Sequence, residues 1–234
     1  EGPGGPILVI SAASNPFSRY PVEILRAEGF NEFYAMDISA VTPVILNDYD
    51  VVILGEMSLT ASDVTMFTDW VTAGGTFIAL RPHSLLSPLL GITSAGGSLS
   101  EAYLLFNTAS GPGLGLVNQT IQFHGTADYY TLNGATAIAT LFSNATTSTI
   151  YPAVTSNNVG PNGGKAIAFT YDLAKSIVYT RQGNPAWAGQ SRDGQAGPIR
   201  SDNLFFPDYI DFNKIEIPQA DEQQRLLSNI ILQG

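Results

Sequence analysis

Short apolar runs alternate with amphipathic segments over roughly the first 95 residues of the chain. The segments 6–12, 32–38, 49–56 and 76–80 are mostly apolar, as is typical of strands buried on both faces of a sheet. Apolar residues recur at helical spacing in the segments between them, which are 20–30, 42–48 and 59–75. This alternation predicts a β-α-β-α-β-α-β unit with a parallel sheet covered by helices on both faces.

The third of these predicted helices carries signals for both of its ends. Thr60 can cap its first turn while Asp63 stands three residues later, which is the spacing of a capping box. Gly74 and Gly75 predict its end, because glycine readily adopts the left-handed conformation that closes a helix.

The pattern changes after Gly91. Short β-rich segments with Asn-Gly and Gly-Pro turn signals fill roughly residues 95–160. We interpret them as a β-rich insertion, made of antiparallel strands or of an excursion from the main sheet. The glycine-rich stretches 94–100 and 108–118 are expected to be loops.

Residues 163–234 are predicted to return to the main fold. Apolar runs at 163–173 and 175–180 predict two further strands, and a final amphipathic helix is expected to begin near Pro218. The polar segment 181–206 is predicted to be a long loop, which in a compact domain is usually functional or disordered. The chain 1–234 is thus predicted to be one domain with its βαβ core at 6–92. The expected fold is a three-layer, flavodoxin-like α/β fold with a mainly parallel sheet, helices on both faces and a β-rich insertion.

Composition excludes several classes of protein. The chain has 20 acidic residues against 10 Lys and Arg, a formal net charge of −10, so it lacks the basic footprint of a nucleic-acid-binding protein. It contains no run of about 18 apolar residues, so no membrane span is expected. The absence of cysteine excludes disulfides, cysteine-based metal sites and a cysteine nucleophile, and no cofactor is predicted.

The two ends of the chain resemble cut points. The chain opens with EGPGGP, which is typical of a linker or a processed end, and it stops just after an apolar helix. Scarce lysine with abundant Ser, Thr and Gly is typical of secreted bacterial proteins. We therefore expect an extracellular or cell-surface bacterial module whose partners include the neighbouring domains of a longer chain.

Polar residues follow several of the predicted strands. In open α/β sheets, ligands bind beyond the carboxyl ends of the strands, so these residues are expected to converge at one edge. They are Ser11, Ser14, Asn15, Arg19, Tyr20, Glu56, Arg81, His83, Arg181 and Asn184. The predicted ligand-binding residues are Asn15, Arg19, Arg81, Arg181, Asn184 and Trp187.

Glu56 and two of the arginines each allow two interpretations. Glu56 directly follows a buried strand and can act as a general acid or base, but an ion pair with Arg81 or Arg19 is favoured. The guanidinium forks of Arg81 and Arg181 can bind a carboxylate or sugar hydroxyls, although structural salt bridges are slightly favoured. The partners considered for these bridges are Glu56, Asp172 and Asp193.

His83 and His124 are candidates for proton transfer. His124 stands four residues before Asp128, so this carboxylate can orient the imidazole, or the pair can contribute two ligands to a metal. Spacing indicates no third ligand, so no metal site is predicted. For both histidines a hydrogen-bonded structural role is favoured.

Trp187 lies in the predicted long loop. With Tyr20 and Tyr179 it can stack on a sugar ring, or it can fix the loop to the body of the domain. The packing role is favoured, because Pro185 restricts the conformational freedom of this segment.

The segment YDVVILGEMSLTASDVTMFTDWVTAGGTFIALRP, residues 49–82, resembles class I glutamine amidotransferase-like domains, in particular their ThuA-like branch. The resemblance covers roughly residues 6–92, and residues 165–184 resemble the late strands of that fold. The chain as a whole, with YTRQGNPAWAGQ and IPQADEQQRLL, resembles N-terminal modules of large secreted bacterial proteins.

The resemblance also has an implication for activity. Catalytic members of that group carry a cysteine on a tight turn after a strand, with His and Glu partners. The corresponding turn here consists of Arg81, Pro82 and His83. Because the chain has no cysteine, Cys-His-Glu glutaminase chemistry is excluded, and the fold can be shared without the activity.

Two functions follow from these observations. The first is a non-catalytic accessory module of a secreted multidomain protein, which binds carbohydrate or packs against neighbouring domains. The second is a hydrolase of a sugar or related polar substrate, with Glu56 and His83 as catalytic residues beside Arg81 and Arg181. An open cleft in which these groups do not neutralise one another favours the hydrolase, and a closed ion-pair network favours the module.

Overall fold

The computed structural model describes residues 4–233. The strands are β1 (Ile7–Ser11), β2 (Phe33–Asp37), β3 (Val51–Leu54), β4 (Thr76–Leu80), β5 (Ile92–Phe106), β6 (Ile121–Leu132), β7 (Thr136–Phe142), β8 (Ser148–Val159) and β9 (Gly164–Phe169). The α-helices are α1 (Pro21–Ala27), α2 (Pro43–Leu46), α3 (Ala61–Thr72), α4 (Leu173–Gln182) and α5 (Gln219–Leu232).

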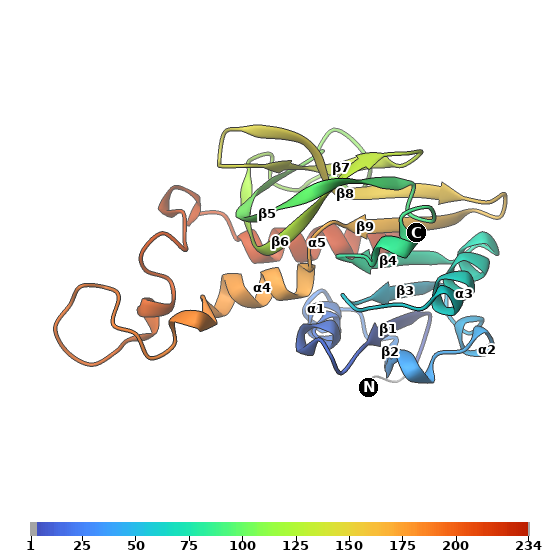
Figure 1. Cartoon of the computed structure of the whole chain (residues 1–234), viewed down its shortest axis with the longest axis horizontal. Helices are drawn as coiled ribbons and strands as arrows, with labels where there is room; N and C mark the ends of the chain where they lie inside the picture. The colour runs from blue at the N-terminus through green and yellow to red at the C-terminus, as the bar shows by residue number, and fades with distance from the viewer. Residues whose placement is uncertain (1–3, 234) are drawn as a thin grey trace.

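All of these strands belong to one sheet, in the order β2-β1-β3-β4-β9-β8-β7-β5-β6 (Figure 1). The strands β2, β1, β3, β4 and β9 are parallel, whereas β8, β7, β5 and β6 pair antiparallel. The sheet is therefore mixed, and the prediction of a flavodoxin-like, mainly parallel sheet is wrong. The reason is that residues 92–159 have no crossover α-helices, so their strands join the same sheet as antiparallel neighbours.

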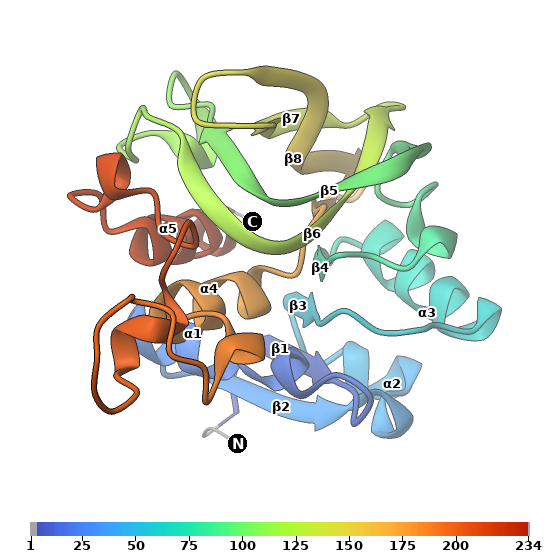
Figure 2. The same cartoon turned by 60° about the vertical axis from the view of Figure 1, so that its left-hand side comes forward.

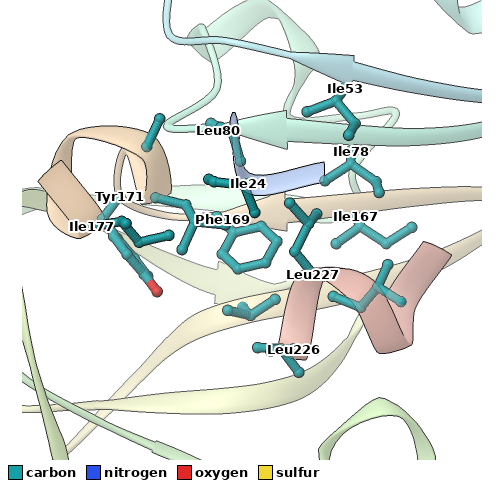
Figure 3. Packing of buried hydrophobic residues seen from close by; sticks show 14 of the residues in the cluster. Ile24, Ile53, Ile78, Leu80, Ile167, Phe169, Tyr171, Ile177, Leu226 and Leu227 are labelled. Carbon is teal, nitrogen blue, oxygen red and sulfur yellow. The ribbon is translucent and has the colours of Figure 1, made fainter. Parts of the chain in front are cut away.

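Both faces of the parallel half are covered by helices. Successive side chains of a strand point to opposite faces, so Val9 of β1 enters one apolar cluster and Leu8 enters the other. Helices α1, α4 and α5 contribute to the first cluster, and α2 and α3 contribute to the second. Figure 3 shows part of the first cluster, to which β9 contributes Phe169 and α5 contributes Leu227.

The antiparallel half curls back onto the parallel half. Ala127 of β6 forms an isolated antiparallel bridge with Tyr171, just beyond the end of β9. The N–H of Asp128 donates to the carbonyl of Thr170 at 3.0 Å. Figure 2 shows β6 curving over the edge of the sheet where β3 and β4 end. The chain thereby brings a strand of the antiparallel half to the carboxyl ends of the parallel strands.

The glycine-rich stretch 94–100 lies inside β5 and is not the loop expected from its composition. Its pairing with β6 is irregular, with a register shift between Ser94 and Ser98. Gly96 and Gly97 allow this shift because both have positive φ, at +72° and +83°. The glycines therefore mark an irregularity within a strand.

The segment 175–180, predicted as a strand, is part of helix α4. Asp172 caps this helix, and its carboxylate accepts the N–H of Lys175 at 3.1 Å. Leu173 and Ile177, one turn apart, are both fully buried in the first cluster. The cap and this packing outweigh the strand propensity of the segment.

Residues 183–217 form an arm that projects from the body beyond α4 (Figure 1). The predicted loop 181–206 begins two residues later than expected, because α4 continues to Gln182. Asp211 fastens the arm to the antiparallel strands: its carboxylate accepts the hydroxyl of Tyr103 at 2.9 Å. The N–H of Asp211 also donates to the side-chain carbonyl of Gln122 at 2.9 Å.

Several predicted helix ends are confirmed. The capping box of α3 forms, because Thr60 Oγ1 accepts the N–H of Asp63 at 3.2 Å and the Asp63 carboxylate accepts the N–H of Thr60 at 2.8 Å. Helix α5 directly follows Pro218, as expected. The first three residues of the opening EGPGGP segment lie outside the described residues. Within residues 4–233, no helix is both long and apolar enough to cross a membrane.

The capping box gives a test of this local structure. We expect Thr60→Ala to lower the free energy of unfolding by about 1 kcal/mol, because it removes the oxygen that accepts the Asp63 N–H. Thr65→Ala is the matched control: Thr65 is exposed in the same helix and its hydroxyl bonds only within the helix, to the carbonyl of Ala61. Urea denaturation of both variants measures the difference, and equal effects would contradict the assigned cap.

Candidate binding site

The carboxyl ends of four parallel strands meet at one edge of the sheet. Asn15 follows β1, Glu56 follows β3, Arg81 follows β4 and Asp172 follows β9. A polar cleft of about 470 Å³ opens at this edge. It is lined by Ser14, Asn15, Glu56, Met57, Ser58, Arg81, Pro82, His83 and Asp128.

Arg81 is the centre of this cleft. Its Nη1 donates to Oε1 of Glu56 at 2.9 Å. Its Nε and Nη2 donate to the two oxygens of Asp128, each at 3.1 Å, which is a bidentate fork on that carboxylate. Glu56 follows a parallel strand and Asp128 lies on β6, so one guanidinium joins the two halves of the sheet.

Arg81 holds an unusual backbone conformation, with φ at +43°. A non-glycine residue in this region carries strain of about 1–3 kcal/mol, which persists only where surrounding contacts enforce it. Here the N–H of Arg81 donates to the carbonyl of Phe169 at 2.8 Å, which continues the pairing of β4 with β9. The backbone conformation of Arg81, its N–H bond to Phe169 and its bonds to the two carboxylates together fix the direction of the guanidinium group.

The side-chain amide of Asn15 fixes the backbone of Glu56. The amide nitrogen of Asn15 donates to the backbone carbonyl of Glu56 at 3.1 Å and to Oδ2 of Asp172 at 3.2 Å. Close packing requires Gly55 at the preceding position, because a Cβ there would lie 2.5 Å from the Cβ of Ser18. The turns after β1 and β3 therefore interlock beneath the cleft.

Burial dominates the electrostatics of the two inner carboxyl groups. It raises the pKa of Glu56 above its usual value; the Arg81 guanidinium lowers this pKa, and the Asp172 carboxyl raises it again. Burial likewise raises the pKa of Asp172, against the lowering effect of the Lys175 N–H. For Arg81, burial lowers the pKa, but its bonds to Asp128 and Glu56 raise it on balance, so the guanidinium stays charged.

Two of the predicted catalytic or binding residues therefore form one network, and two more line the same cleft. Glu56 pairs with Arg81, which is the favoured structural interpretation, while Asn15 and His83 also face the cleft. The Nδ1 of His83 accepts the N–H of Leu85 at 3.4 Å and caps a short turn.

The other predicted residues lie elsewhere. Arg181 is on α4 and bonds Asp221 at 2.8 Å, and it also donates to the hydroxyl of Tyr20 at 3.4 Å. Asn184 caps the first turn of the arm through the N–H of Ala186. Arg19 is exposed at the end of the turn Pro16–Arg19. Arg181 and Asn184 stay outside the cleft because residues 175–182 are helical and carry the chain away from the sheet edge.

Trp187 packs within the arm. The guanidinium carbon of Arg192 lies 3.9 Å from the centroid of its ring, and Tyr209 meets the ring nearly edge-on at 5.5 Å. Tyr209 in turn stacks on His124 at 4.0 Å. This series of contacts fixes the arm to the body, which agrees with the favoured packing role of the tryptophan.

The suggested pairing of His124 with Asp128 is wrong. The side chain of His124 is only 4% exposed, and its Nδ1 lies 2.6 Å from Oε2 of Glu101. Asp128 is hydrogen-bonded to Arg81 instead. Glu101 sits at a β-bulge with φ at +49°, where the register of β5 and β6 shifts. No spacing in the sequence indicates this contact, because it joins two residues 23 positions apart and depends on the register of β5 and β6.

The role of Asp128 at the cleft was also missed. In the sequence Asp128 stands out only by its spacing from His124, because the return of β6 to the end of β9 has no local sequence signal. Among residues 4–233, no group of three or more His, Asp or Glu side chains is arranged to hold a metal ion.

No protein-family model matches the chain, and no curated protein matches it in sequence. Similar folds occur in solved structures. A cold-adapted β-galactosidase from Rahnella sp. R3 is 18% identical with a TM-score of 0.56, and the match covers 76% of this chain and 31% of that one. An exo-β-1,4-mannosidase from Opitutaceae bacterium strain TAV5 is 13% identical with a TM-score of 0.56, covering 76% and 33% of the two chains.

A cytoplasmic protein of Salmonella typhimurium is also similar, at 13% identity and a TM-score of 0.53, and the match covers 72% of this chain and 88% of that one. The chain thus spans about a third of the glycosidases it resembles. Likeness at these identities shows a shared fold alone. It is the mixed-sheet fold found within these glycosidases, and it gives no support to the amidotransferase-like, flavodoxin-like description suggested by the sequence.

The fork between Arg81 and Asp128 is expected to be energetically coupled. In a double-mutant cycle of Arg81→Met and Asp128→Asn, we expect a coupling of about 1–2 kcal/mol, because both hydrogen bonds are charge-assisted and the groups are only partly exposed. The control cycle uses Arg181 and Asp221, a more exposed single bond, for which less than about 1 kcal/mol is expected. Equal couplings in urea denaturation would contradict the central place of Arg81.

The raised pKa of Glu56 predicts a pH dependence. A carboxyl group whose pKa is higher in the folded state stabilises the fold most at low pH, and this contribution is lost as pH rises from 4.5, the usual value, through the raised pKa. We expect the unfolding free energy of Glu56→Gln, relative to the parent, to increase between about pH 4 and pH 7. Denaturation at four pH values measures this trend, and a constant or falling difference would refute it.

Proposed function

We propose that this domain is a non-catalytic saccharide-binding accessory module of a larger secreted protein, and that the cleft around Arg81 is its binding site. The observation that carries the proposal is the pair of carboxylates held by one guanidinium at the rim of an open polar cleft. Carboxylates in fixed positions accept hydrogen bonds from neighbouring sugar hydroxyls, while the guanidinium prevents them from repelling each other.

The ion-pair network favours binding over catalysis. An ion pair with a cation favours the charged form of a carboxyl group, whereas a general acid has to carry a proton. Glu56 and Asp128 share Arg81, and His83 uses Nδ1 to accept a backbone N–H. The arrangement supplies fixed acceptors without a paired base and nucleophile.

The structural comparisons support this proposal in a general way. Two of the similar structures are described as a β-galactosidase and a mannosidase, and both are about three times as long as the region shared with this chain. A domain of this fold can thus form one part of a larger carbohydrate-active protein. The low content of lysine and the high content of Ser, Thr and Gly support secretion.

A hydrolase remains the second candidate, and the raised pKa of Glu56 is the observation that favours it. A buried carboxyl group with a raised pKa is suited to donate a proton to a leaving group. This candidate requires turnover that disappears when Glu56 becomes glutamine.

The test combines binding and hydrolysis on one panel of oligosaccharides. We expect the parent to bind at least one oligosaccharide in a glycan array and by calorimetry, with no product formed. Glu56→Gln and Asp128→Asn are expected to weaken binding about tenfold each, because each removes a charged acceptor. Asp221→Asn, at an ion pair outside the cleft, is the control.

Absence of binding to every oligosaccharide would overturn the proposal. Turnover by the parent that is lost in Glu56→Gln would replace it with the hydrolase. Circular dichroism on each variant shows that the fold is retained.

A further inference from the structure

We propose that Asp172 is a positioning residue of the cleft: its charged form holds the side-chain amide of Asn15 on Glu56, and taking up a proton loosens that hold. This role goes beyond the proposed function, because it applies whatever the cleft binds. It follows from the burial of one carboxyl group and from the two hydrogen bonds that this group accepts.

Asp172 stands between the last parallel strand and the helix that follows it. Its Oδ1 accepts the N–H of Lys175 at 3.1 Å and so caps α4. Its Oδ2 accepts the side-chain N–H of Asn15 at 3.2 Å, and the same amide nitrogen donates to the backbone carbonyl of Glu56 at 3.1 Å. One carboxyl group thus connects the start of α4 with the turns after β1 and β3.

The carboxyl group of Asp172 is buried without a cation of its own. The residue is only 4% exposed, and in the described part of the chain none of the ion pairs includes it. A buried and unpaired charge is costly, so a carboxyl group in such a place favours its neutral form. Burial accordingly raises the pKa of Asp172, and its hydrogen bonds from Lys175 and Asn15 lower it only in part. We therefore expect Asp172 to take up its proton at a higher pH than an ordinary aspartate.

The charged groups around Asp172 act in opposite directions. The ammonium group of Lys175 favours the charged form, although its Nζ lies over two aromatic rings rather than on the carboxylate. Glu56 disfavours a second negative charge: besides burial, the Asp172 carboxyl raises the pKa of Glu56, and such a repulsion is mutual. Arg81 is shared between Glu56 and Asp128. The strongest cation of this edge is therefore engaged by the two other carboxylates.

A proton changes what Asp172 does for Asn15. A charged carboxylate only accepts hydrogen bonds, and bonds to it are roughly twice as strong as bonds between neutral groups, whereas a protonated carboxyl group also donates one. Because Oδ1 caps α4, we expect the proton on Oδ2, which then presents an O–H to the N–H of Asn15. Their bond weakens, and the Asn15 amide is held by the Glu56 carbonyl alone. Since the Glu56 side chain bonds Arg81, the change reaches the cleft.

NMR of the isotope-labelled chain tests this role without any ligand. Carboxyl carbon signals follow the charges of Asp172 and Glu56 between about pH 3 and pH 8, and the side-chain amide signals of Asn15 follow its hydrogen bonds. The Asn15 signals are assigned by their absence from the spectrum of Asn15→Ser. We expect them to shift at the same pH as the carboxyl carbon of Asp172.

Asp172→Asn tests whether this carboxyl group causes the shift. The amide oxygen of the variant can still cap α4, while its NH₂ group imitates the O–H of the protonated acid. We expect the Asn15 signals to lose their pH-dependent shift and to resemble those of the parent at low pH. Asp211→Asn is the matched control: Asp211 caps a turn of the arm through the N–H of Asn213 at 2.9 Å, so the Asn15 shift should persist.

A second variant moves the transition instead of removing it. Lys175→Met removes an ammonium group that, against the effect of burial, lowers the pKa of Asp172, and it keeps the backbone N–H that the carboxylate accepts. We expect the signals of Asp172 and Asn15 to shift together to higher pH. This variant tests the inference even where Asp172→Asn lowers the stability of α4.

The possible results are distinct. Asn15 signals that stay constant while Asp172 titrates overturn the inference, and so do signals that keep the parent's transition in Lys175→Met. A shift that persists in Asp172→Asn, or that disappears in Glu56→Gln, also overturns it, because Glu56 is then the group that acts on Asn15. No saccharide is present, so each of these results leaves the saccharide-binding proposal standing, and absence of saccharide binding leaves the role of Asp172 standing.

Discussion

The guanidinium of Arg81 is the interaction on which the arrangement at the sheet edge depends. Its three hydrogen bonds connect Glu56, after a parallel strand, with Asp128, on an antiparallel one. Without this cation two carboxylates would face each other at a partly buried edge, where like charges are costly. The same group therefore connects the two halves of the sheet at the cleft.

This clamp requires a particular path of the chain. The bridge between Ala127 and Tyr171 places β6 beside the end of β9, and the following residue, Asp128, is then within reach of Arg81. The strained φ of Arg81 is maintained by the pairing of its N–H with Phe169. Stability and site geometry are thus coupled, since a change that loosens β6 also releases the acceptor that it carries.

The sequence predicts the parallel half of the fold much better than the antiparallel half. Strand and helix periodicities are local, so they place β4 and the capping box at Thr60 correctly. Glycines in 94–100 suggested a loop, although in β5 they accommodate a register shift. The segment 175–180 has strand propensity, yet the Asp172 cap and burial against the sheet make it helical. These outcomes are determined by contacts distant in sequence.

The same division applies to the site. Asn15, Glu56 and Arg81 are predictable because each comes within four residues of the end of a parallel strand, and the carboxyl ends of such strands share an edge. Asp128 is not, because its place depends on β6 returning from the antiparallel half. That residue changes the chemistry of the cleft, because it binds Nε and Nη2 of Arg81 and places a second carboxylate beside Glu56. The arrangement of charges at this cleft is therefore a property of the topology of the domain.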